Sequence, residues 1–203
     1  MSRRVWSRVW ERLEDADRDS FAVVPTLVAL HEAVVAVDVS RVVAILERPR
    51  HDDLVRQVRE AGARVRLITD GDVAGVIHCA DPDNTGVDMY LGTGGAPEGV
   101  LAAVALRCIG GQMQCRLILD SEEKRERAAK MGVNDPKMIY GIEDMARGDC
   151  LFAATGVTTG SLLTGVKFRK DVIETETVVM RSVTGTVRWI RAEHRQLEKF
   201  HLD

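Results

Sequence analysis

Three apolar segments of this chain are each followed by a polar loop and a segment with helical spacing, and this alternation limits the possible folds more than any other feature. The apolar runs are 42–46, 65–68 and 87–91, and the predicted helices are 52–61, 73–79 and 97–109. Strands that alternate with helices of this length form a largely parallel sheet through right-handed crossovers. The sequence therefore predicts an α/β fold with three layers, in which a mixed, mostly parallel sheet carries helices on both faces.

The second half of the chain follows a different pattern. A fourth strand is predicted over 114–119, and Ser121 begins a charged helix that ends near Gly132. Three further strands are predicted over 151–157, 175–181 and 186–192. The last of these alternates apolar and charged residues, as a half-exposed antiparallel strand does. The simplest interpretation is that these strands complete the mixed sheet.

Residues 1–38 differ from the rest of the chain. Their apolar residues recur at the spacing of one helix face, which predicts an amphipathic helix that begins near Val5 and includes Trp6 and Trp10. No site chemistry is evident there. We therefore expect an atypical N-terminal helical segment over 1–38 and one α/β domain over 39–203.

Composition narrows the classes of partner. Charged residues make up 29% of the chain but leave a formal charge of only −3, which gives no electrostatic case for nucleic acid or an anionic membrane. No run approaches the roughly 18 apolar residues that span a bilayer. The four cysteines form no C-x-x-C pair, which favours reduced thiols over a zinc site. An acidic run over 11–19 argues against a cleaved secretory signal, so we expect a soluble cytoplasmic protein.

The loops after the first three strands hold the candidate site. They read R-P-R-H over 48–51, D-G-D over 70–72 and G-T-G-G-A-P-E-G over 92–99. In open α/β sheets, ligands bind outside the carboxyl ends of the strands, where loops converge and helix N-termini present free N–H groups. Cations, carboxylates and a glycine-rich nest on one edge predict a phosphorylated ligand with a divalent metal.

Glu98 has two interpretations. A carboxylate in the first turn of a helix complements the helix dipole and needs no other reason. Beside a phosphate nest, however, an acid repels the ligand unless a metal lies between them, which favours a metal ligand. The glycine spacing is not the G-x-G-x-x-G fingerprint of dinucleotide binding.

The other loop residues also have alternatives. Asp72 is either a helix N-cap after a turn at Gly71, or an acceptor with Asp70 for sugar hydroxyls. Arg48 and Arg50, on a loop that Pro49 holds extended, suit a phosphate better than solvent. His51 is more plausible as a cap or surface residue than as a general acid or base. The T-G-V-T-T-G run over 155–160 is either a plain turn or a donor of hydroxyl and N–H groups to an anion.

These motifs resemble class II fructose-1,6-bisphosphatase, a family of bacterial metal-dependent sugar phosphatases that includes enzymes acting on sedoheptulose bisphosphate. The resemblance runs from about Val39 to Phe200 and includes E-R-P-R-H, D-G-D-V-A, G-T-G-G-A-P-E-G-V-L-A-A, L-F-A-A-T-G-V-T and T-E-T-V-V-M-R-S. It implies the C-terminal half of the sugar-phosphatase fold, Mn²⁺ or Mg²⁺ as cofactor and a homo-oligomer. It also implies Glu98 as a metal ligand and substrate contacts from Arg48, Pro49, Arg50, Asp70, Gly71, Asp72 and Gly95.

The chain departs from the family in one respect. Family members carry most of their metal-binding acids in an upstream portion with a D-P-x-E-G-T stretch, and no such stretch occurs here. Hydrolysis of a phosphate ester by two metals needs several carboxylates. We therefore expect a truncated gluconeogenic fructose-bisphosphatase that keeps the substrate-binding part and is inactive alone. The alternative is a non-catalytic sugar-phosphate-binding or regulatory module.

Overall fold

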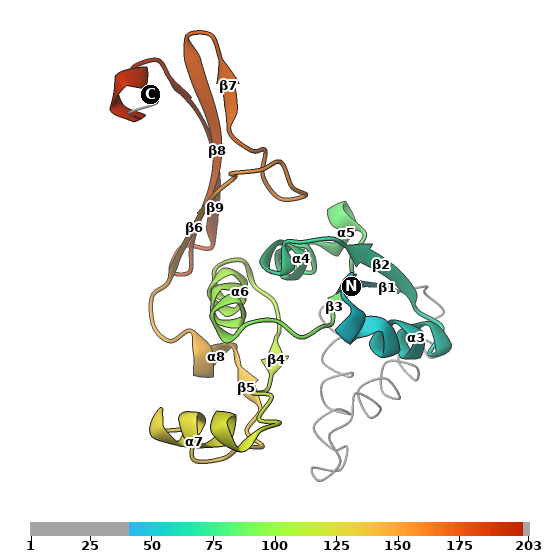
Figure 1. The fold of residues 1–203 in the computed structure, drawn as a ribbon. Helices are drawn as coiled ribbons and strands as arrows, with labels where there is room; N and C mark the ends of the chain where they lie inside the picture. Colours follow the sequence, from blue (N-terminus) through green and yellow to red (C-terminus); the bar gives the residue numbers. More distant parts are fainter. Residues whose placement is uncertain (1–40, 201–203) are drawn as a thin grey trace. The chain divides into compact units, whose positions relative to one another are not determined.

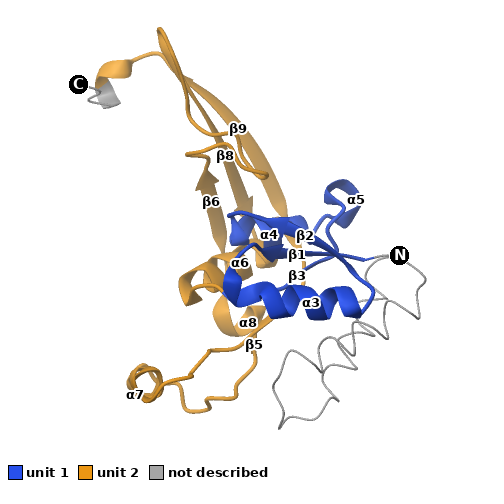
Figure 2. Ribbon diagram, turned by 45° about the vertical axis from the view of Figure 1, so that its right-hand side comes forward, with its two compact units in different colours: residues 1–93 blue, residues 94–203 orange. Residues whose placement is uncertain are grey.

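The structure is a computed structural model that describes residues 41–200, and it consists of two compact units, residues 1–93 and 94–203 (Figure 2). The amphipathic helix expected over 1–38 lies outside the described residues, so it remains a prediction. The boundary between the units falls inside the glycine-rich segment, between Thr93 and Gly94.

The first unit contains the first two predicted strand–loop–helix repeats and the third predicted strand, while the helix of the third repeat belongs to the second unit (Figure 1). The elements of the first unit in chain order are β1 (Val42–Leu46), η1 (Pro49–His51), α3 (Asp52–Glu60), β2 (Arg64–Ile68), α4 (Asp72–His78), α5 (Pro82–Thr85) and β3 (Met89–Tyr90). The three strands form one parallel sheet in the order β2-β1-β3. A parallel sheet with its crossover helices confirms the predicted α/β class.

The strand order decides which face each helix covers. The chain moves from β1 to one neighbour and then crosses back to the other, and two right-handed crossovers in opposite directions place their helices on opposite faces. Helix α3 packs against β2, while α4 packs against β1 and β3. Figures 1 and 2 both show α3 and α4 on the two sides of the sheet.

The central strand β1 supplies the core of the first unit. Four of its five residues are buried, which fits the uniformly apolar sequence V-V-A-I-L of a strand covered on both faces. Val43 and Ile45 pack with Val58 of α3 on one face. Tyr90 is the register partner of Ala44 on the neighbouring strand, and Gly75 of α4 lies against the Tyr90 ring.

The second unit pairs its strands separately from the parallel sheet. Its elements are α6 (Ala96–Ile109), β4 (Gln114–Cys115), α7 (Glu122–Lys130), β5 (Tyr140–Gly141), α8 (Ile142–Met145), β6 (Leu151–Thr155), β7 (Lys167–Arg169), β8 (Val172–Arg181), β9 (Thr186–His194) and η2 (Leu197–Phe200). β6, β7 and β9 all pair antiparallel with β8, and β4 pairs antiparallel with β5.

The expectation that these strands complete the mixed sheet is therefore wrong. β7, β8 and β9 are joined by short turns, so each finds its partner in its sequence neighbour and the strands close into their own sheet. The predicted strand 114–119 is reduced to two residues, because within the described chain its only partner is the equally short β5.

Helix α6 forms the core of the second unit against the antiparallel sheet. Its buried side chains are mostly small, and Ala102, Ala103 and Ala105 let the helix approach β6 and β8 closely. Phe152, Val178 and Met180 supply larger buried side chains from the sheet. The helix stops at Gly110, whose φ of 84° lies in the left-handed region that favours glycine.

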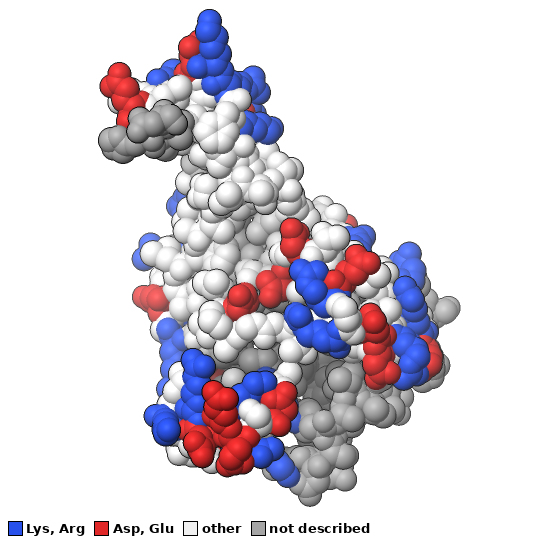
Figure 3. All heavy atoms as spheres, in the orientation of Figure 1, with Lys and Arg blue, Asp and Glu red and all other residues white. Residues whose placement is uncertain are grey.

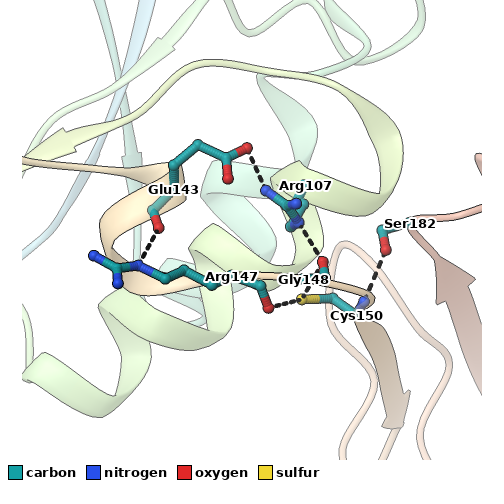
Figure 4. Close-up of polar contacts among 6 residues, drawn as sticks. All are labelled: Arg107, Glu143, Arg147, Gly148, Cys150 and Ser182. Atoms are coloured by element: carbon teal, nitrogen blue, oxygen red, sulfur yellow. Dashed lines mark hydrogen bonds and ion pairs between the residues drawn. The ribbon is translucent and has the colours of Figure 1, made fainter.

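A polar network holds the end of α6 to the segment before β6 (Figure 4). Arg107 donates from Nε to the Gly148 carbonyl at 2.8 Å and forms an ion pair with Glu143 of α8. The backbone N–H of Cys150 donates to Ser182 Oγ at 2.7 Å, which joins β6 to the end of β8. The network therefore links four elements of this unit through side-chain and backbone groups.

The T-G-V-T-T-G run packs as a tight loop. A Cβ on Gly156 would lie 2.2 Å from the Thr164 carbonyl oxygen, and one on Gly165 would lie 2.5 Å from the Thr159 nitrogen. The Gly165 N–H donates to Thr159 Oγ1 at 3.1 Å. These contacts favour the interpretation of the run as a turn closed by its own groups.

The surface of helix α7 carries both signs of charge. Acidic and basic side chains are interspersed over it in Figure 3, as its sequence E-E-K-R-E-R-A-A-K requires. Ser121 caps the helix as predicted, because its Oγ accepts from the Lys124 N–H at 3.3 Å. Along the part of the chain that the structure describes, no helix is long and apolar enough to cross a membrane.

Candidate functional site at the carboxyl edge of the parallel sheet

The strand order β2-β1-β3 makes β1 and β3 parallel neighbours, so the segments that follow them leave from the same edge of the sheet. Ligands of open α/β sheets bind outside this carboxyl edge. The loop Glu47–His51 follows β1, and the segment Leu91–Thr93 follows β3. The first of the predicted polar loops therefore lies where the fold itself favours a ligand.

Arg50 and His51 tie these two loops together. The Arg50 guanidinium donates from Nε and Nη2 to the Thr93 carbonyl, at 3.1 and 2.7 Å. His51 Nε2 accepts from the Thr93 N–H at 2.9 Å, and His51 Nδ1 lies 2.8 Å from the Leu46 carbonyl oxygen. Since Nε2 is an acceptor, the ring proton is on Nδ1 and donates to Leu46.

His51 is therefore a structural brace. It occupies the N-cap position of α3, as one interpretation of the sequence held, but its side chain makes no cap hydrogen bond. It is only 2% exposed, so the interpretation as a surface residue is wrong. Both ring nitrogens are occupied by backbone partners, which leaves neither free for general acid or base chemistry. A histidine was needed here to satisfy one carbonyl and one N–H in a buried position.

The arginine loop bends more than the sequence suggested. Arg48 is extended, as a residue before proline should be, but Pro49 begins the 3-10 turn η1 instead of holding the loop extended. Arg48 donates from Nη1 to the Glu47 carbonyl at 2.7 Å and is half-buried. Arg50 is exposed, so its remaining N–H donors are accessible to a ligand.

The D-G-D loop opens helix α4 one residue earlier than expected. Gly71 takes the N-cap position with φ of 75°, which only glycine adopts at little cost, and this confirms the predicted turn. Asp72 is the first helical residue and not the N-cap, and its Oδ1 accepts from the Val73 N–H at 2.9 Å. Asp70 is exposed, and Asp72 is half-buried.

The glycine-rich segment does not form a nest of the expected kind. A nest needs a residue in the left-handed region, and Gly92, Gly94 and Gly95 have no positive φ. Gly92 serves close packing instead, because a Cβ there would lie 3.3 Å from both His51 Cε1 and Tyr90 Oη. Gly95 is the N-cap of α6 with φ of −75°.

Glu98 lies in the first turn of α6, as predicted, and its carboxylate folds back over Gly95. A Cβ on Gly95 would lie 2.1 Å from Glu98 Oε2, so glycine at 95 permits this position of the carboxylate. Over residues 41–198 no three side chains of His, Cys, Asp or Glu gather as metal ligands would. Glu98 can supply one oxygen ligand to a hard cation, but these residues do not by themselves fit a metal ion.

Sequence reasoning missed Tyr90. Its hydroxyl oxygen is buried and has no hydrogen-bond partner. Burial of the phenol and the negative charge of Asp72 raise the pKa of Tyr90 to about 12, while Arg50 and Arg48 act in the opposite direction. The only sequence signal was the position of a polar aromatic residue at the end of a strand that leads into a candidate loop.

The fold and this edge define the class as an α/β protein with arginines and carboxylates at the carboxyl ends of parallel strands. The chain belongs to the bacterial fructose-1,6-bisphosphatase family encoded by glpX, whose family model matches residues 24–194. The match begins upstream of Val39, where the resemblance in the sequence was expected to start.

Curated relatives agree with this family. The chain is 43% identical over 166 residues to a protein of Synechocystis sp. named D-fructose 1,6-bisphosphatase class 2/sedoheptulose 1,7-bisphosphatase; the match covers 75% of this chain and 48% of that protein. A protein of the same name from Synechococcus sp. strain JA-3-3Ab is 44% identical over 165 residues, or 75% of this chain and 47% of its own length. The chain thus spans about half the length of these relatives.

Proposed function

We propose that this chain is the sugar-bisphosphate-binding part of a metal-dependent phosphatase that removes the 1-phosphate of fructose 1,6-bisphosphate. The arrangement that supports the proposal is the position of the R-P-R-H and D-G-D loops and the Leu91–Thr93 segment at the carboxyl ends of neighbouring parallel strands. Membership of the family and the names of its relatives support the same ligand.

Each candidate residue has a proposed role. Arg48 and Arg50 donate to phosphoryl oxygens, because forked guanidinium groups match that geometry. Pro49 and Gly71 shape the loops, and Asp70 and Asp72 accept from sugar hydroxyls. Gly95 contacts the substrate through its backbone once the Glu98 carboxylate turns away from it, and Glu98 supplies one ligand to Mn²⁺ or Mg²⁺. Metal ions in such phosphatases polarise the phosphoryl group and activate water.

We propose the pathway, compartment and partners that are expected for this family. The reaction serves gluconeogenesis in the cytoplasm, the ligand is a small sugar bisphosphate, and no nucleic acid or membrane takes part. We further propose that the chain forms a homo-oligomer.

Titration calorimetry with fructose 1,6-bisphosphate tests the proposal. The wild-type chain should bind saturably, and Arg48→Ala should weaken binding about 10-fold or more, because a hydrogen bond to a charged group contributes about 1.5–3 kcal/mol. Arg48 is preferable to Arg50 for this test, since Arg50 also holds the Thr93 carbonyl.

Arg59→Ala is the matched control. It removes the same charge from the last turn of α3, which lies at the opposite edge of the sheet from the loops. This variant should bind like the wild type. Absence of saturable binding by the wild-type chain, with and without Mn²⁺, would contradict the proposed function.

A second candidate is a non-catalytic sugar-phosphate-binding or regulatory module. It is favoured by the lack of any group of three metal-ligating side chains among the described residues. The same samples separate the two candidates: binding without phosphate release under Mn²⁺ or Mg²⁺, including when the other half of a relative is supplied as a separate chain, supports the module.

A further inference from the structure

The Tyr90 side chain runs along the α4 face of the parallel sheet toward its carboxyl edge. The ring lies against α4, because a Cβ on Gly75 would be 3.0 Å from Tyr90 Cδ2 and 3.2 Å from Cε2. The hydroxyl lies beside Gly92, beyond the end of β3, where a Cβ would be 3.3 Å from Tyr90 Oη. Two glycines thus make room for this ring, one beside its edge and one beside its hydroxyl.

The hydroxyl at the end of this ring is an unused donor. Tyr90 Oη and the Gln57 side-chain oxygen are the buried side-chain oxygen and nitrogen atoms without a partner in the described chain. Buried polar groups are nearly always paired, and leaving one unpaired costs about 1–3 kcal/mol. A phenylalanine would fill the same space without this cost, so the hydroxyl needs a function that the unliganded chain does not show.

The charges around the hydroxyl indicate which kind of ligand atom it binds. Arg48 and Arg50 act on it from the loop after β1, and Asp72 acts from the start of α4. Burial and Asp72 hold the pKa of Tyr90 near 12, so the group stays protonated and can donate at neutral pH. A protonated hydroxyl in the positive field of two arginines suits a negatively charged oxygen, and hydrogen bonds to ionised acceptors are the stronger ones.

We propose that the Tyr90 hydroxyl donates a hydrogen bond to a phosphoryl oxygen of the bound sugar phosphate, as a further binding residue beside Arg48 and Arg50. This inference rests on the proposed function and adds a residue to its site. Gly92 lies beside the hydroxyl, and glycine has no side chain there to block a ligand. Because Tyr90 Oη is buried, the proposal requires the Leu91–Thr93 segment to shift when the ligand binds.

The experiment compares Tyr90→Phe with the wild type, using inorganic phosphate and fructose 1,6-bisphosphate as probes in titration calorimetry. Tyr90→Phe removes one oxygen atom and keeps the ring. Tyr140→Phe, at the only other tyrosine of the chain, is the matched control because Tyr140 lies in β5 of the second unit. Thermal unfolding of the unliganded proteins is measured in parallel.

The proposal expects two effects in opposite directions. Tyr90→Phe should bind both probes about 10-fold more weakly, as expected when a hydrogen bond to a charged group is lost. The unliganded variant should melt at the same temperature as the wild type or higher, because an unpaired buried group has been removed. Tyr140→Phe should bind both probes like the wild type.

Other outcomes overturn the inference in distinguishable ways. Binding of both probes by Tyr90→Phe at wild-type affinity shows that the hydroxyl meets no ligand, while the proposed function stands. Weaker binding of the bisphosphate but not of phosphate overturns the phosphoryl assignment in favour of a sugar hydroxyl. A lower melting temperature shows that the hydroxyl has a partner in the free protein. If the wild-type chain binds phosphate but not the bisphosphate, the proposed function is wrong. The comparison of phosphate binding by Tyr90→Phe and by the wild type then still tests the role of the hydroxyl.

Discussion

Glycine at position 95 matters for the carboxylate next to it. The backbone there has φ of −75°, which alanine adopts without strain, yet a Cβ would lie 2.1 Å from Glu98 Oε2. The obstacle is the end of a flexible side chain, so it can rotate away. Substitution at 95 therefore acts on the position of Glu98 more than on the fold.

A double-mutant cycle measures this coupling. Gly95→Ala should destabilise the chain slightly in the wild-type background and less in a Glu98→Ala background, with a coupling free energy of about 0.5–1 kcal/mol for residues in contact. Urea unfolding of the four proteins gives this value. Equal effects of Gly95→Ala in the two backgrounds would show that the two side chains do not compete for space.

Gly99→Ala is the control on the same helix. Nothing lies within 4 Å of a Cβ at Gly99, and the residue is inside α6. Replacing an unobstructed helical glycine by alanine should raise the free energy of unfolding by up to about 1 kcal/mol. Gly95 is the N-cap and Gly99 is inside the helix, so opposite signs are expected, and the Glu98→Ala background separates the contribution of Glu98 from that of the cap position.

At the scale of the elements, a buried carboxylate stabilises the three antiparallel strands β7, β8 and β9. Glu174 of β8 is only 6% exposed and pairs with Arg169 Nε at 2.8 Å and Arg191 Nη2 at 2.7 Å. The hydrogen bond from Arg191, followed by the charge of Arg169, holds the pKa of Glu174 below its usual range. Because this pKa is lower in the folded state than in the unfolded state, the stability of the folded chain depends on pH.

Glu174 should therefore stabilise the chain at neutral pH and lose this effect in acid. The unfolded carboxyl has an ordinary pKa of about 4.3, so as pH falls below that value the unfolded state takes up the proton first and stability decreases until the folded carboxyl is also protonated. Glu174→Gln should lower the melting temperature at pH 7 and reduce the fall in stability between about pH 5 and pH 3.

The comparison variant is Glu193→Gln on β9, whose carboxylate is about half-exposed and pairs with the exposed Arg195. Exposed pairs contribute little, so its melting temperature should follow the wild type at each pH. Some slope will remain in Glu174→Gln, because the pKa of Glu176 is also lowered, chiefly by its backbone hydrogen bond from Thr164. An unchanged acid slope in Glu174→Gln would rule out this role.

Local sequence signals predicted the elements whose causes are local. Ser121 as the cap of α7, the turn at Gly71 and the stop of α6 at Gly110 each depend on residues within one helical turn. His51 and Tyr90 could not be interpreted in this way. His51 accepts from Thr93, 42 residues away in the chain, and the Tyr90 ring lies against Gly75 of α4, so their roles follow only from the tertiary fold.

At the scale of the whole chain, the same distinction explains the sheets. The parallel sheet of the first unit was predictable because each crossover helix leaves a clear period in the sequence. The partners of 151–157 and 186–192 were not, since an alternating strand pairs equally well in a mixed sheet or in a separate antiparallel one. The turn at 182–185 joins β8 to β9, and residues 173–181 of β8 pair with all of β9.

Hydrolysis of a phosphate ester requires many residues of a protein to act together. Two-metal phosphate hydrolysis needs several carboxylates, and metal stabilisation of the phosphoryl group is worth several kcal/mol. The described residues offer Glu98 and no group of three metal-ligating side chains, and the chain spans about half the length of its relatives. We therefore expect the purified chain with Mn²⁺ to release phosphate from fructose 1,6-bisphosphate at least about 100-fold more slowly than the Synechocystis relative. Glu98→Gln, purified identically, reports any contaminating phosphatase. Release at the rate of the relative that disappears in Glu98→Gln would show that this chain alone assembles the metal centre.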